Sequence, residues 1–405
     1  MLEDAETVAL RSLCERTLHH NWLDGTRAAD RVSFAYTRPS PRHYPWQWYW
    51  DSCFAAIAWR HFDRERSRSE LQTLLAAGRP DGFIGHTIFW TGPPRDLRRF
   101  TYNIPSRSAP MTVSIQPPAL AWAWRIAVGD PAREPQIVRH HQWLAANRDL
   151  AGDGLIWIVQ PDESGLDASP QFDAIWGRHV HGRPGFLRLA RRNRRLGYDL
   201  RRIHAAGGPV CCEVLTNVLY GLSRLSLGEP SLTPTIVERM YDSATGLFWP
   251  LARPQPQRRP ALTWAALSPL ALPDLPEAIG RQLVEEHLLA GEQFWLPVPP
   301  PSASAIDPAF SLRDSVLPGL RRYWRGPTWI NSAWLLWLGL VRLGYREQAE
   351  ELTRRIARTV LASGLREYYH PYTGRGMGAS SFAWSTLVME LTEADPLAAL
   401  SYLAG

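Results

Sequence analysis

Residues 327–343 read Pro327-Thr328-Trp329-Ile330-Asn331-Ser332-Ala333-Trp334-Leu335-Leu336-Trp337-Leu338-Gly339-Leu340-Val341-Arg342-Leu343, and residues 329–341 of this segment are the richest apolar stretch of the chain. Its apolar residues recur at helical spacing, and the proline in the first turn lacks an N–H group that a helix start leaves unpaired anyway. A membrane-spanning helix needs roughly 18 uncharged apolar residues, and this run is shorter and contains Asn331. The stretch therefore predicts a helix of a soluble protein that has no membrane partner.

The same spacing recurs along most of the chain. We predict helices over residues 51–75, 118–128, 131–147, 211–226, 275–289, 327–343, 346–362 and 382–391. Strand patterns are few and short. The predicted fold class is therefore all-α.

A second pattern lies between the helices: a turn followed by a short run that contains aromatic or bulky apolar residues. It occurs at residues 81–83, 153–157, 245–249, 291–295 and 364–369. This weak repeat has the size of helical hairpins joined by loops of variable length, and it predicts a closed ring of about a dozen helices with the loops at one end. Because no Ser/Gly-rich linker divides the chain, we expect a single domain.

The composition excludes several kinds of chemistry. The chain has 405 residues, 45% of them hydrophobic, which allows a core that is stable without disulfides or metals. All 45 residues in the Lys+Arg count are arginine, so a pyridoxal-phosphate Schiff base, a lysine nucleophile and a Walker A loop are excluded. The four cysteines form no Cys-x-x-Cys pair, and we expect them to be buried thiols. The acidic N-terminus lacks the apolar region of a signal peptide, which indicates a cytoplasmic protein.

The formal net charge of +6 includes one dense group of arginines. This arginine cluster comprises Arg188, Arg191, Arg192, Arg194, Arg195, Arg201 and Arg202. It is either a solvated surface or a site for a small anionic ligand, because arginine binds a carboxylate through two parallel hydrogen bonds. Elsewhere both signs of charge are interspersed and no nucleic-acid-binding motif occurs, so no nucleic-acid partner is expected. The oligomeric state stays open, a homo-oligomer included.

Aromatic residues concentrate in two loop-like segments, 44–51 and 323–331. Aromatic faces beside polar groups suit a sugar, which has apolar C–H faces and a rim of hydroxyls. Most of the 19 tryptophans are expected to pack in the core. Trp50 and Trp324 are favoured as ligand contacts, because each adjoins a charged residue.

Acidic residues on such loops are what glycoside hydrolysis requires. One carboxyl is protonated and releases the leaving group, and the other is ionised and activates water. The candidates are Asp51, Asp162, Glu163, Asp167, Asp173 and Glu367. Physical reasoning alone does not choose among them.

Several motifs resemble those of glycoside hydrolase family 63, in order and across residues 44–385. They are Trp50-Asp51-Ser52-Cys53-Phe54, Gln116-Pro117-Pro118, Glu163-Ser164-Gly165-Leu166-Asp167, Trp324-Arg325-Gly326-Pro327-Thr328-Trp329-Ile330-Asn331, Glu367-Tyr368-Tyr369, Gly374-Arg375-Gly376-Met377-Gly378 and Phe382-Ala383-Trp384-Ser385. That family contains the processing α-glucosidase of the endoplasmic reticulum and bacterial mannosylglycerate and glucosylglycerate hydrolases. The trehalases are more distant relatives.

The resemblance implies a fold, a reaction and roles for residues. The fold would be an (α/α)6 barrel, with residues 1–405 forming one catalytic domain and a loop-rich excursion at about 155–210 covering part of the active site. Hydrolysis would invert the anomeric configuration, with Asp167 as general acid and Glu367 as general base. The sugar would be held by Trp48, Trp50, Asp51, Gln116, Trp324, Arg325, Gly326 and Trp384. For Asp51, a structural alternative is a helix N-cap before residues 52–59.

The length of the chain is similar to that of the glycerate-releasing members. In those enzymes a tyrosine before the Trp-Asp motif, a histidine in the next loop and a tyrosine before Trp-Arg-Gly grip glycerate. The matching residues are Tyr44, His86 and Tyr323, although a structural role for His86 is equally open. The arginine cluster would supply the partner of the glycerate carboxylate. One departure is that residues 379–382 contain no glutamine, where the resemblance leads us to expect one that contacts glycerate.

The best prediction is hydrolysis of glucosylglycerate or mannosylglycerate to a hexose and glycerate. One alternative is an inverting α-glucosidase for a neutral disaccharide or oligosaccharide, in which the arginine cluster is only surface. Another is a sugar isomerase or epimerase that uses histidine pairs, and a last one is a sugar-binding protein without activity. No cofactor and no metal site are expected, although a calcium ion bound by loop carboxylates stays open.

Overall fold

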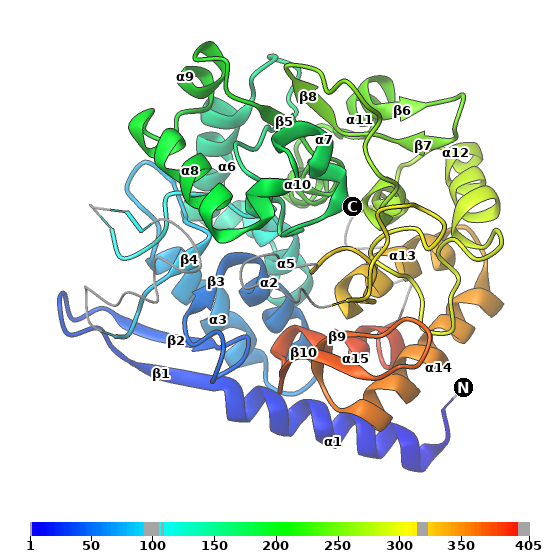
Figure 1. Cartoon of the computed structure of the whole chain (residues 1–405). Helices are drawn as coiled ribbons and strands as arrows, with labels where there is room; N and C mark the ends of the chain where they lie inside the picture. Colours follow the sequence, from blue (N-terminus) through cyan, green and yellow to red (C-terminus); the bar gives the residue numbers. More distant parts are fainter. Residues whose placement is uncertain (1, 93–104, 107–108, 314–322, 396–405) are drawn as a thin grey trace.

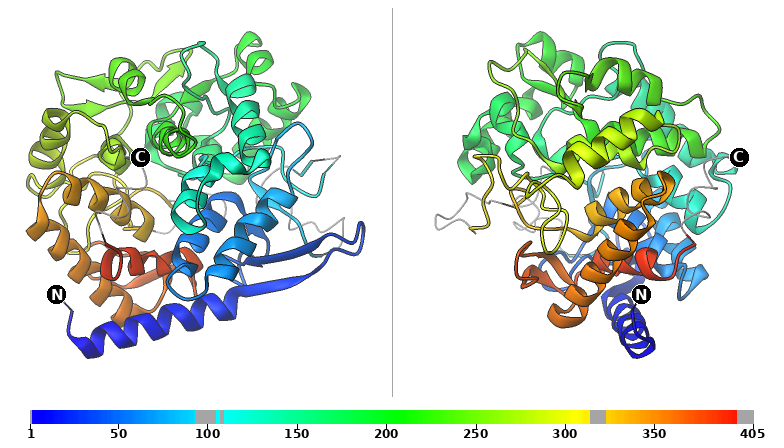
Figure 2. Two further views of the ribbon diagram at one scale, coloured as in Figure 1. Left: turned by 180° about the vertical axis from the view of Figure 1, so that it is seen from behind. Right: turned by 90° about the vertical axis from the view of Figure 1, so that its right-hand side faces the viewer.

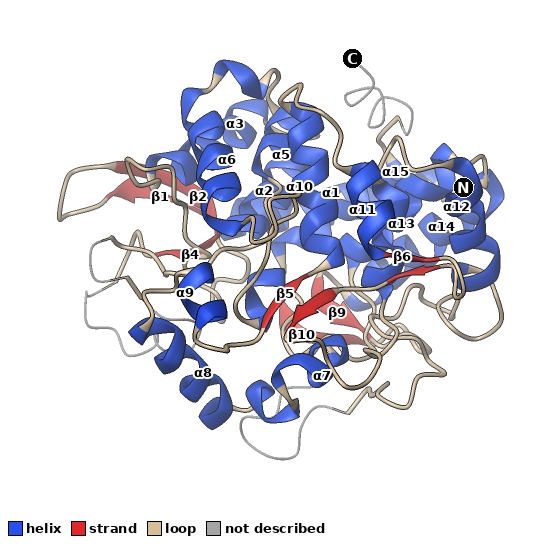
Figure 3. Ribbon diagram, turned by 90° about the horizontal axis from the view of Figure 1, so that it is seen from above, coloured by secondary structure: helices blue, strands red, loops and turns tan. Residues whose placement is uncertain are grey.

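The computed structural model describes residues 2–92, 105–106, 109–313 and 323–395. Helices dominate this part of the chain, and each β-sheet in it consists of two short strands (Figures 1 and 3). The predominantly helical fold predicted from the sequence is therefore confirmed. Among the described residues, no helix is both long enough and apolar enough to cross a membrane.

Six helical segments of the described chain form an inner layer. They are α2 (Tyr49–Trp59), α5 (Leu120–Ala127), α10 (Val214–Ser226), the 3-10 helix η5 (Trp264–Ala271), α13 (Ile330–Arg342) and the 3-10 helix η7 (Ala383–Leu387). Each packs against the next, and η7 packs against α2, so the contacts close into a ring. Every residue of α2 and of η5 is buried. Their sequences are apolar on all sides, as expected for helices surrounded by protein.

A second layer of amphipathic helices follows the inner ones in sequence. It consists of α3 (Arg64–Ala76), α6 (Pro135–Arg148), α11 (Thr233–Met240), α12 (Glu277–Gln282) with its π-helical continuation η6 (Leu283–Leu288), α14 (Arg346–Ser363) and α15 (Val388–Thr392). In α14, for example, Leu352, Ile356 and Val360 form the buried face. Helix α1 (Asp4–Asn21) lies outside this layer and packs against α14, α15 and η7 (Figure 2).

The five turns recognised in the sequence separate these helical pairs. They come directly after α3, α6, α11, η6 and α14, where the chain returns from the outer layer toward the next inner helix. The weak sequence repeat therefore marks one helical hairpin per repeat. This confirms the interpretation of the pattern as a series of hairpins.

Several predicted helix boundaries are wrong. The segment 131–147 begins with the separate 3-10 turn η1 (Pro131–Arg133), the helix predicted over 327–343 starts only at Ile330, and two other segments differ more. The segment 51–75 forms two helices, because α2 ends at Trp59 and the Asp63 carboxylate caps α3 by accepting hydrogen bonds from the backbone N–H groups of Glu65 and Arg66. The segment 211–226 begins as strand β5 (Val210–Cys212), and its helix starts only at Val214. Helix α1 was not predicted, because its buried stripe of Leu10, Cys14 and Leu18 is narrow.

The strands are short antiparallel pairs at the loops. They are β1 (Trp22–Thr26) with β2 (Ser33–Thr37), β3 (Gln47–Trp48) with β4 (Thr87–Ile88), β5 with β8 (Leu251–Arg253), β6 (Tyr241–Asp242) with β7 (Leu247–Phe248), and β9 (Arg366–Tyr369) with β10 (Gly376–Ser380). Residues 155–210 contain the 3-10 turns η2 (Pro161–Ser164), η3 (Pro170–Phe172) and η4 (Arg178–His181) and the helices α7 (Asp173–Trp176), α8 (Arg183–Arg195) and α9 (Leu200–Ala205). All four cysteines are buried free thiols, as predicted.

Candidate active site

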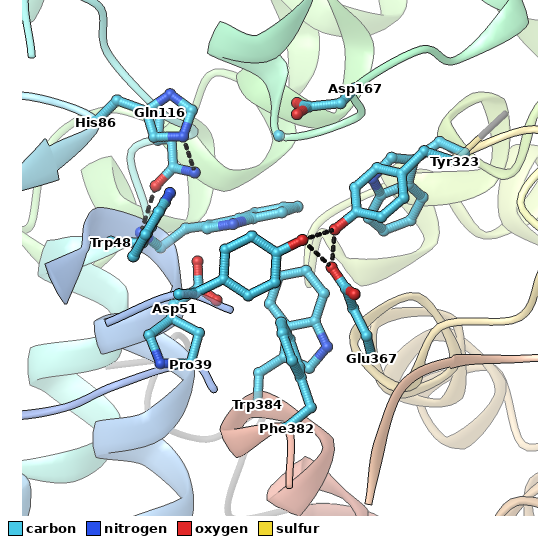
Figure 4. A pocket seen from close by; sticks show the side chains of 14 residues that line it. Pro39, Trp48, Asp51, His86, Gln116, Asp167, Tyr323, Glu367, Phe382 and Trp384 are labelled. Atoms are coloured by element: carbon cyan, nitrogen blue, oxygen red, sulfur yellow. Dashed lines mark hydrogen bonds between the residues drawn. The ribbon is translucent and has the colours of Figure 1, made fainter. Parts of the chain in front are cut away.

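A pocket lies where several inner helices begin. Trp50 and Asp51 are in the first turn of α2, Gln116 precedes α5, Trp324 precedes α13, and Trp384 is in the first turn of η7. The complete lining of the described pocket is Pro39, Tyr44, Trp48, Trp50, Asp51, His86, Gln116, Gly165, Asp167, Tyr323, Trp324, Glu367, Phe382 and Trp384 (Figure 4). Residues far apart in sequence thus meet because the hairpins bring their helix starts together.

Glu367, on β9, is almost completely buried, and both its carboxylate oxygens accept hydrogen bonds. Oε1 accepts from the hydroxyls of Tyr44 (2.9 Å) and Tyr323, and Oε2 accepts from the backbone N–H of Ala379 (2.8 Å). The two hydroxyls are themselves 3.3 Å apart (Figure 4). Three donors on one carboxyl group stabilise its ionised form, which is the form that can take a proton from water.

Asp167 lies across the pocket from Glu367 and is partly buried (Figure 4). Its loop is connected to the opposite wall, because the backbone carbonyl of Asp167 accepts a hydrogen bond from the backbone N–H of Trp324 (3.4 Å). The same loop brings Gly165 so close to Trp50 that a Cβ atom at this glycine would lie 2.5 Å from the indole ring. The two candidate carboxyls therefore face the cavity from opposite sides.

A buried ion pair fixes the loop that carries Asp167. The Arg148 guanidinium donates to both oxygens of Glu163, over 2.9 and 2.7 Å, and neither side chain is more than 2% exposed. The backbone N–H groups of Ile115 and Val159 donate to the same carboxylate. With four donors, Glu163 acts as an anchor and not as a catalytic acid. It does not line the pocket.

Asp51 is the third residue of α2, so the alternative that it is the N-cap residue is wrong: the N-cap position belongs to Trp48. The Asp51 side chain is only 7% exposed and faces the cavity. Burial, with repulsion from Glu367 as the next cause, raises the pKa of Asp51 well above its usual range. Both causes favour the protonated form of Asp51, which can donate a hydrogen bond to a ligand.

His86 and Gln116 form a fixed pair in the wall. Gln116 Oε1 accepts a hydrogen bond from the backbone N–H of Trp50 (3.0 Å). This leaves Gln116 Nε2 to donate to Nε2 of His86 (2.7 Å). Burial lowers the pKa of His86 to about 3, so the ring is neutral. Since Nε2 accepts, the ring proton resides on Nδ1.

The structure brings eleven of the thirteen predicted site residues into the lining of this pocket; Arg325 and Gly326 are the two outside it. The Arg325 guanidinium donates to both oxygens of Asp173, over 3.0 Å for Nη1. Asp173 also accepts a hydrogen bond from His181 (2.9 Å). Burial opposes ionisation of Asp173, but the hydrogen bonds from His181 and Arg325 outweigh it and lower the pKa of this carboxyl.

No arginine of the described chain lines the pocket, and this includes the arginine cluster of α8 and α9. Most members of the cluster are exposed on the outer side of α8 and α9, while Leu189, Ala190 and Asn193 form the buried side of α8. The structure therefore places the cluster at the surface. The two candidates left from the sequence, Asp162 and Asp173, also lie outside the lining.

Three lining residues were not predicted as site residues. Gly165 and Phe382 stand within motifs quoted for the family resemblance, next to predicted residues, and their position there was a usable signal. Pro39 lies between β2 and β3 in a segment with no such motif, so the sequence contained no signal for it. Within the described ranges, no three His, Cys, Asp or Glu side chains are grouped so that they could hold a metal ion.

Comparisons with known proteins extend these observations. Residues 44–224 and 229–385 match the model of the mannosylglycerate hydrolase MGH1-like glycoside hydrolase domain. The chain is 30% identical to mannosylglycerate hydrolase of Thermus thermophilus over 413 residues, which covers 87% of this chain and 95% of that one. It is 27% identical to glucosylglycerate hydrolase of Mycolicibacterium hassiacum over 420 residues, 86% of this chain and 92% of that one.

Comparison with solved structures indicates the same family. The crystal structure of the family 63 mannosylglycerate hydrolase from Thermus thermophilus in complex with Tris and D-glycerate has a TM-score of 0.74 at 28% identity, covering 94% of this chain and 99% of that one. Neutral trehalase from Saccharomyces cerevisiae shares the fold, with a TM-score of 0.55 at 13% identity, covering 96% of this chain and 82% of that one. The family model matches most of the chain, and the carboxyl-lined pocket lies within the matched residues. The chain belongs to the mannosylglycerate hydrolase MGH1-like glycoside hydrolases of family 63 and is a glycoside hydrolase.

Proposed function

We propose that this enzyme hydrolyses α-linked hexosylglycerates, mannosylglycerate or glucosylglycerate, to a hexose and glycerate with inversion at the anomeric carbon. The observation that supports this most is the pair of carboxyls, Asp167 and Glu367, on opposite sides of one aromatic pocket (Figure 4). The relatives named for these two substrates and the related structure with D-glycerate supply the substrate class.

In the proposed reaction, Asp167 donates its proton to the glycosidic oxygen while the bond from that oxygen to the anomeric carbon breaks. A water molecule on the opposite face forms the new bond to the anomeric carbon, and Glu367 accepts the proton that this water loses. An inverting enzyme needs about 6.5–9.5 Å between the two carboxyls to admit the water. Glycerate leaves with the proton from Asp167, and the hexose is released as the β-anomer.

The pocket lining supports a proposal for the substrate subsites. The hexose is held by Trp48, Trp50, Asp51, Gln116, Trp324 and Trp384, where indole faces and polar groups alternate. Glycerate is held by Tyr44, Tyr323 and His86. The two tyrosine hydroxyls donate their protons to Glu367 and accept hydrogen bonds from the hydroxyls of glycerate, and His86 donates through Nδ1–H. Arg325 and Gly326 support this wall from behind, since Arg325 is engaged by Asp173.

We also propose that the inner and outer layers form one (α/α)6 barrel, which is a single catalytic domain over residues 1–405. The closed ring of inner contacts supports this. Residues 155–210 cover part of the active site in this proposal. Asp167 lies in this segment, and Asp173 of the same segment pairs with Arg325.

A second candidate is an inverting α-glucosidase for a neutral disaccharide. One observation favours it: the described lining contains three carboxyls and no arginine that could pair with a substrate carboxylate. A proton NMR time course with glucosylglycerate, mannosylglycerate and kojibiose as competing substrates separates the two proposals. Early β-anomer from a hexosylglycerate supports the first. Early α-anomer overturns inversion, and consumption of kojibiose alone overturns the glycerate substrate.

A further inference from the structure

The hairpin that carries Glu367 has an irregular register at this residue. Strands β9 and β10 pair Met377 with Tyr368, but the next pair is Ser380 with Arg366. Two residues of β10, Gly378 and Ala379, therefore lie opposite the single residue Glu367. This is a β-bulge, and its first residue, Gly378, has the left-handed conformation (φ 64°) that is typical of the G1 type of bulge.

The bulge changes where one backbone N–H group points. In a regular ladder the N–H groups of β10 alternate between the partner strand and the outside. Here the Ala379 N–H donates instead to the side chain of the opposite residue, Glu367 Oε2, over 2.8 Å. Ala379 is only 4% exposed, so solvent offers little competition for this hydrogen bond.

Gly378 also allows the close approach of the carboxylate. A Cβ atom at this position would lie 2.6 Å from Glu367 Oε2 and 2.5 Å from the Tyr368 ring. Glu367 and Tyr368 are both buried, so an added Cβ atom fits only if these side chains shift. Any residue larger than glycine would therefore displace the carboxylate from its present orientation.

We propose that the bulge at Gly378 and Ala379 positions the general base. It directs one backbone N–H group toward Glu367 Oε2, and this hydrogen bond fixes the orientation of the carboxylate that takes the proton from water. The inference rests on the proposed function, in which Glu367 is the base. Gly378 and Ala379 act through Glu367 and are positioning residues. Bulges beside active sites often redirect a side chain in this way.

The first test compares two glycines of the same hairpin. Gly378→Ala introduces the steric conflict with Glu367. Gly374→Ala is the matched control, because Gly374 has nearly the same left-handed conformation (φ 69°) but its Cβ atom would lie 3.4 Å from Thr359, which is an ordinary contact. Both variants are expected to lower the Tm, since both place alanine at a positive φ, and Gly378→Ala is expected to lower it further because of the added steric conflict.

Kinetics then separates the two variants. Gly378→Ala is expected to lower kcat roughly 10- to 100-fold with little change in KM. It is also expected to move the acid limb of the kcat/KM profile upward by about one pH unit, because an ionised carboxylate loses one backbone donor. Gly374→Ala keeps the parent's kcat and acid limb. If Gly378→Ala matches Gly374→Ala in both quantities, the proposal is overturned.

A second measurement uses the parent enzyme and does not depend on the folding of a variant. Residues 378 and 379 are the only Gly-Ala pair in the sequence. Labelling glycine with carbonyl ¹³C and alanine with ¹⁵N therefore gives a single carbonyl–amide NMR signal, that of the Ala379 N–H. We expect this signal to shift with pH at the midpoint of the acid limb, and to stay constant with pH in Glu367→Gln.

These results also distinguish the proposal from the proposed function. If Glu367→Gln retains activity, Glu367 is not the base and both fall. If Glu367→Gln is inactive while the Ala379 signal does not follow the acid limb, the proposed function stands and the role of the bulge is overturned. A signal that shifts equally in the parent and in Glu367→Gln reports another group, and it overturns the role of the bulge as well.

Discussion

Asp51 illustrates, at the scale of one residue, how a binding site lowers stability. Its carboxyl is buried, and burial together with the negative charges of Glu367, Glu70 and Asp167 raises its pKa. An aspartate whose pKa is raised by folding stabilises the protein fully only below the pKa of the unfolded chain. Stability is then lost as the pH rises toward the folded value, by about 1.4 kcal/mol for each pH unit of the shift.

Asp51→Asn removes this unfavourable ionisation and is expected to raise the free energy of unfolding at pH 8 more than at pH 5. The same change is expected to lower kcat/KM by about 100-fold or more, since a hydrogen-bonding group of the sugar site is altered. Urea unfolding at both pH values and steady-state kinetics measure the two effects. A variant that is less stable than the parent at pH 8 would show that Asp51 is ionised and well paired in the folded protein.

Glu70 is a buried carboxyl that does not line the pocket, and it allows the same principle to be tested at a group without substrate contact. Its oxygens accept hydrogen bonds from Ser52 Oγ (2.5 Å) and from the Thr37 N–H (2.6 Å). Burial nevertheless raises the pKa of Glu70 to about 8. The contribution of this group to stability is therefore lost as the pH rises from about 4.5 through 8.

Glu70→Gln imitates the protonated form and is expected to make the protein more stable than the parent at pH 8, by on the order of 2–4 kcal/mol. At pH 5 the two proteins are expected to differ little. Urea unfolding across this range is the measurement, and Glu350→Gln, on the exposed side of α14, is the control. Parallel pH profiles for the parent and Glu70→Gln would contradict the prediction.

At the scale of elements, the ion pair of Arg148 and Glu163 connects helix α6 to the turn η2, directly before Asp167. Removing one partner of a buried pair leaves the other charge without compensation and costs about 3–5 kcal/mol. We expect Glu163→Gln and Arg148→Met each to be strongly destabilising, and the double variant to be less so than the sum. A double-mutant cycle with urea unfolding measures the coupling, and additive effects would refute it.

The same elements show which parts of the structure the sequence could predict. The hairpins were predictable, because each repeat ends in a turn followed by aromatic or bulky apolar residues. Helix η5 was not, because its eight residues are apolar without helical periodicity and contain Pro269. The motifs indicated Glu367 and Asp167. They did not indicate the ion pair between Asp173 and Arg325, since no sequence pattern links residues 152 positions apart.

The bulge opposite Glu367 could not be predicted from the sequence either. The motif containing Gly376 and Gly378 was visible in the sequence, but the sequence does not state which strand it pairs with or in which register. Only the pairing of β9 with β10 shows that Gly378 faces the carboxylate. Long-range register is a property of the folded chain, whereas motifs report short stretches of it.

At the scale of the whole molecule, the ring of inner helices places several helix starts around the pocket, where negatively charged side chains are stabilised. The starts of α2 and η7 contribute pocket residues, and the start of a helix has a partial positive charge from its unpaired N–H groups. Three carboxyls are gathered at this end of the ring. The hairpin arrangement thus supplies part of the electrostatic compensation that a site rich in acids needs.

The ring also depends on close packing between neighbouring inner helices, which two buried glycines test. Gly339 of α13 meets η5 so closely that a Cβ atom would lie 2.6 Å from Leu270 Cβ and 2.8 Å from the Leu270 carbonyl oxygen. Gly221 of α10 has room, since its nearest contact would be 3.5 Å from Leu272. Overpacking a core typically costs about 1–3 kcal/mol, whereas glycine to alanine inside a helix gains up to about 1 kcal/mol.

We therefore expect Gly339→Ala to lower the free energy of unfolding and Gly221→Ala to leave it unchanged or raise it, although both sites are buried in inner helices. Gly339→Ala separates α13 from η5, and α13 directly follows the segment that carries Tyr323 and Trp324, so a lower kcat/KM is expected as well. Urea unfolding and kinetics of both variants provide the test. Equal stability of the two variants would mean that α13 and η5 can move apart without loss, and that the ring is not closely packed at this contact.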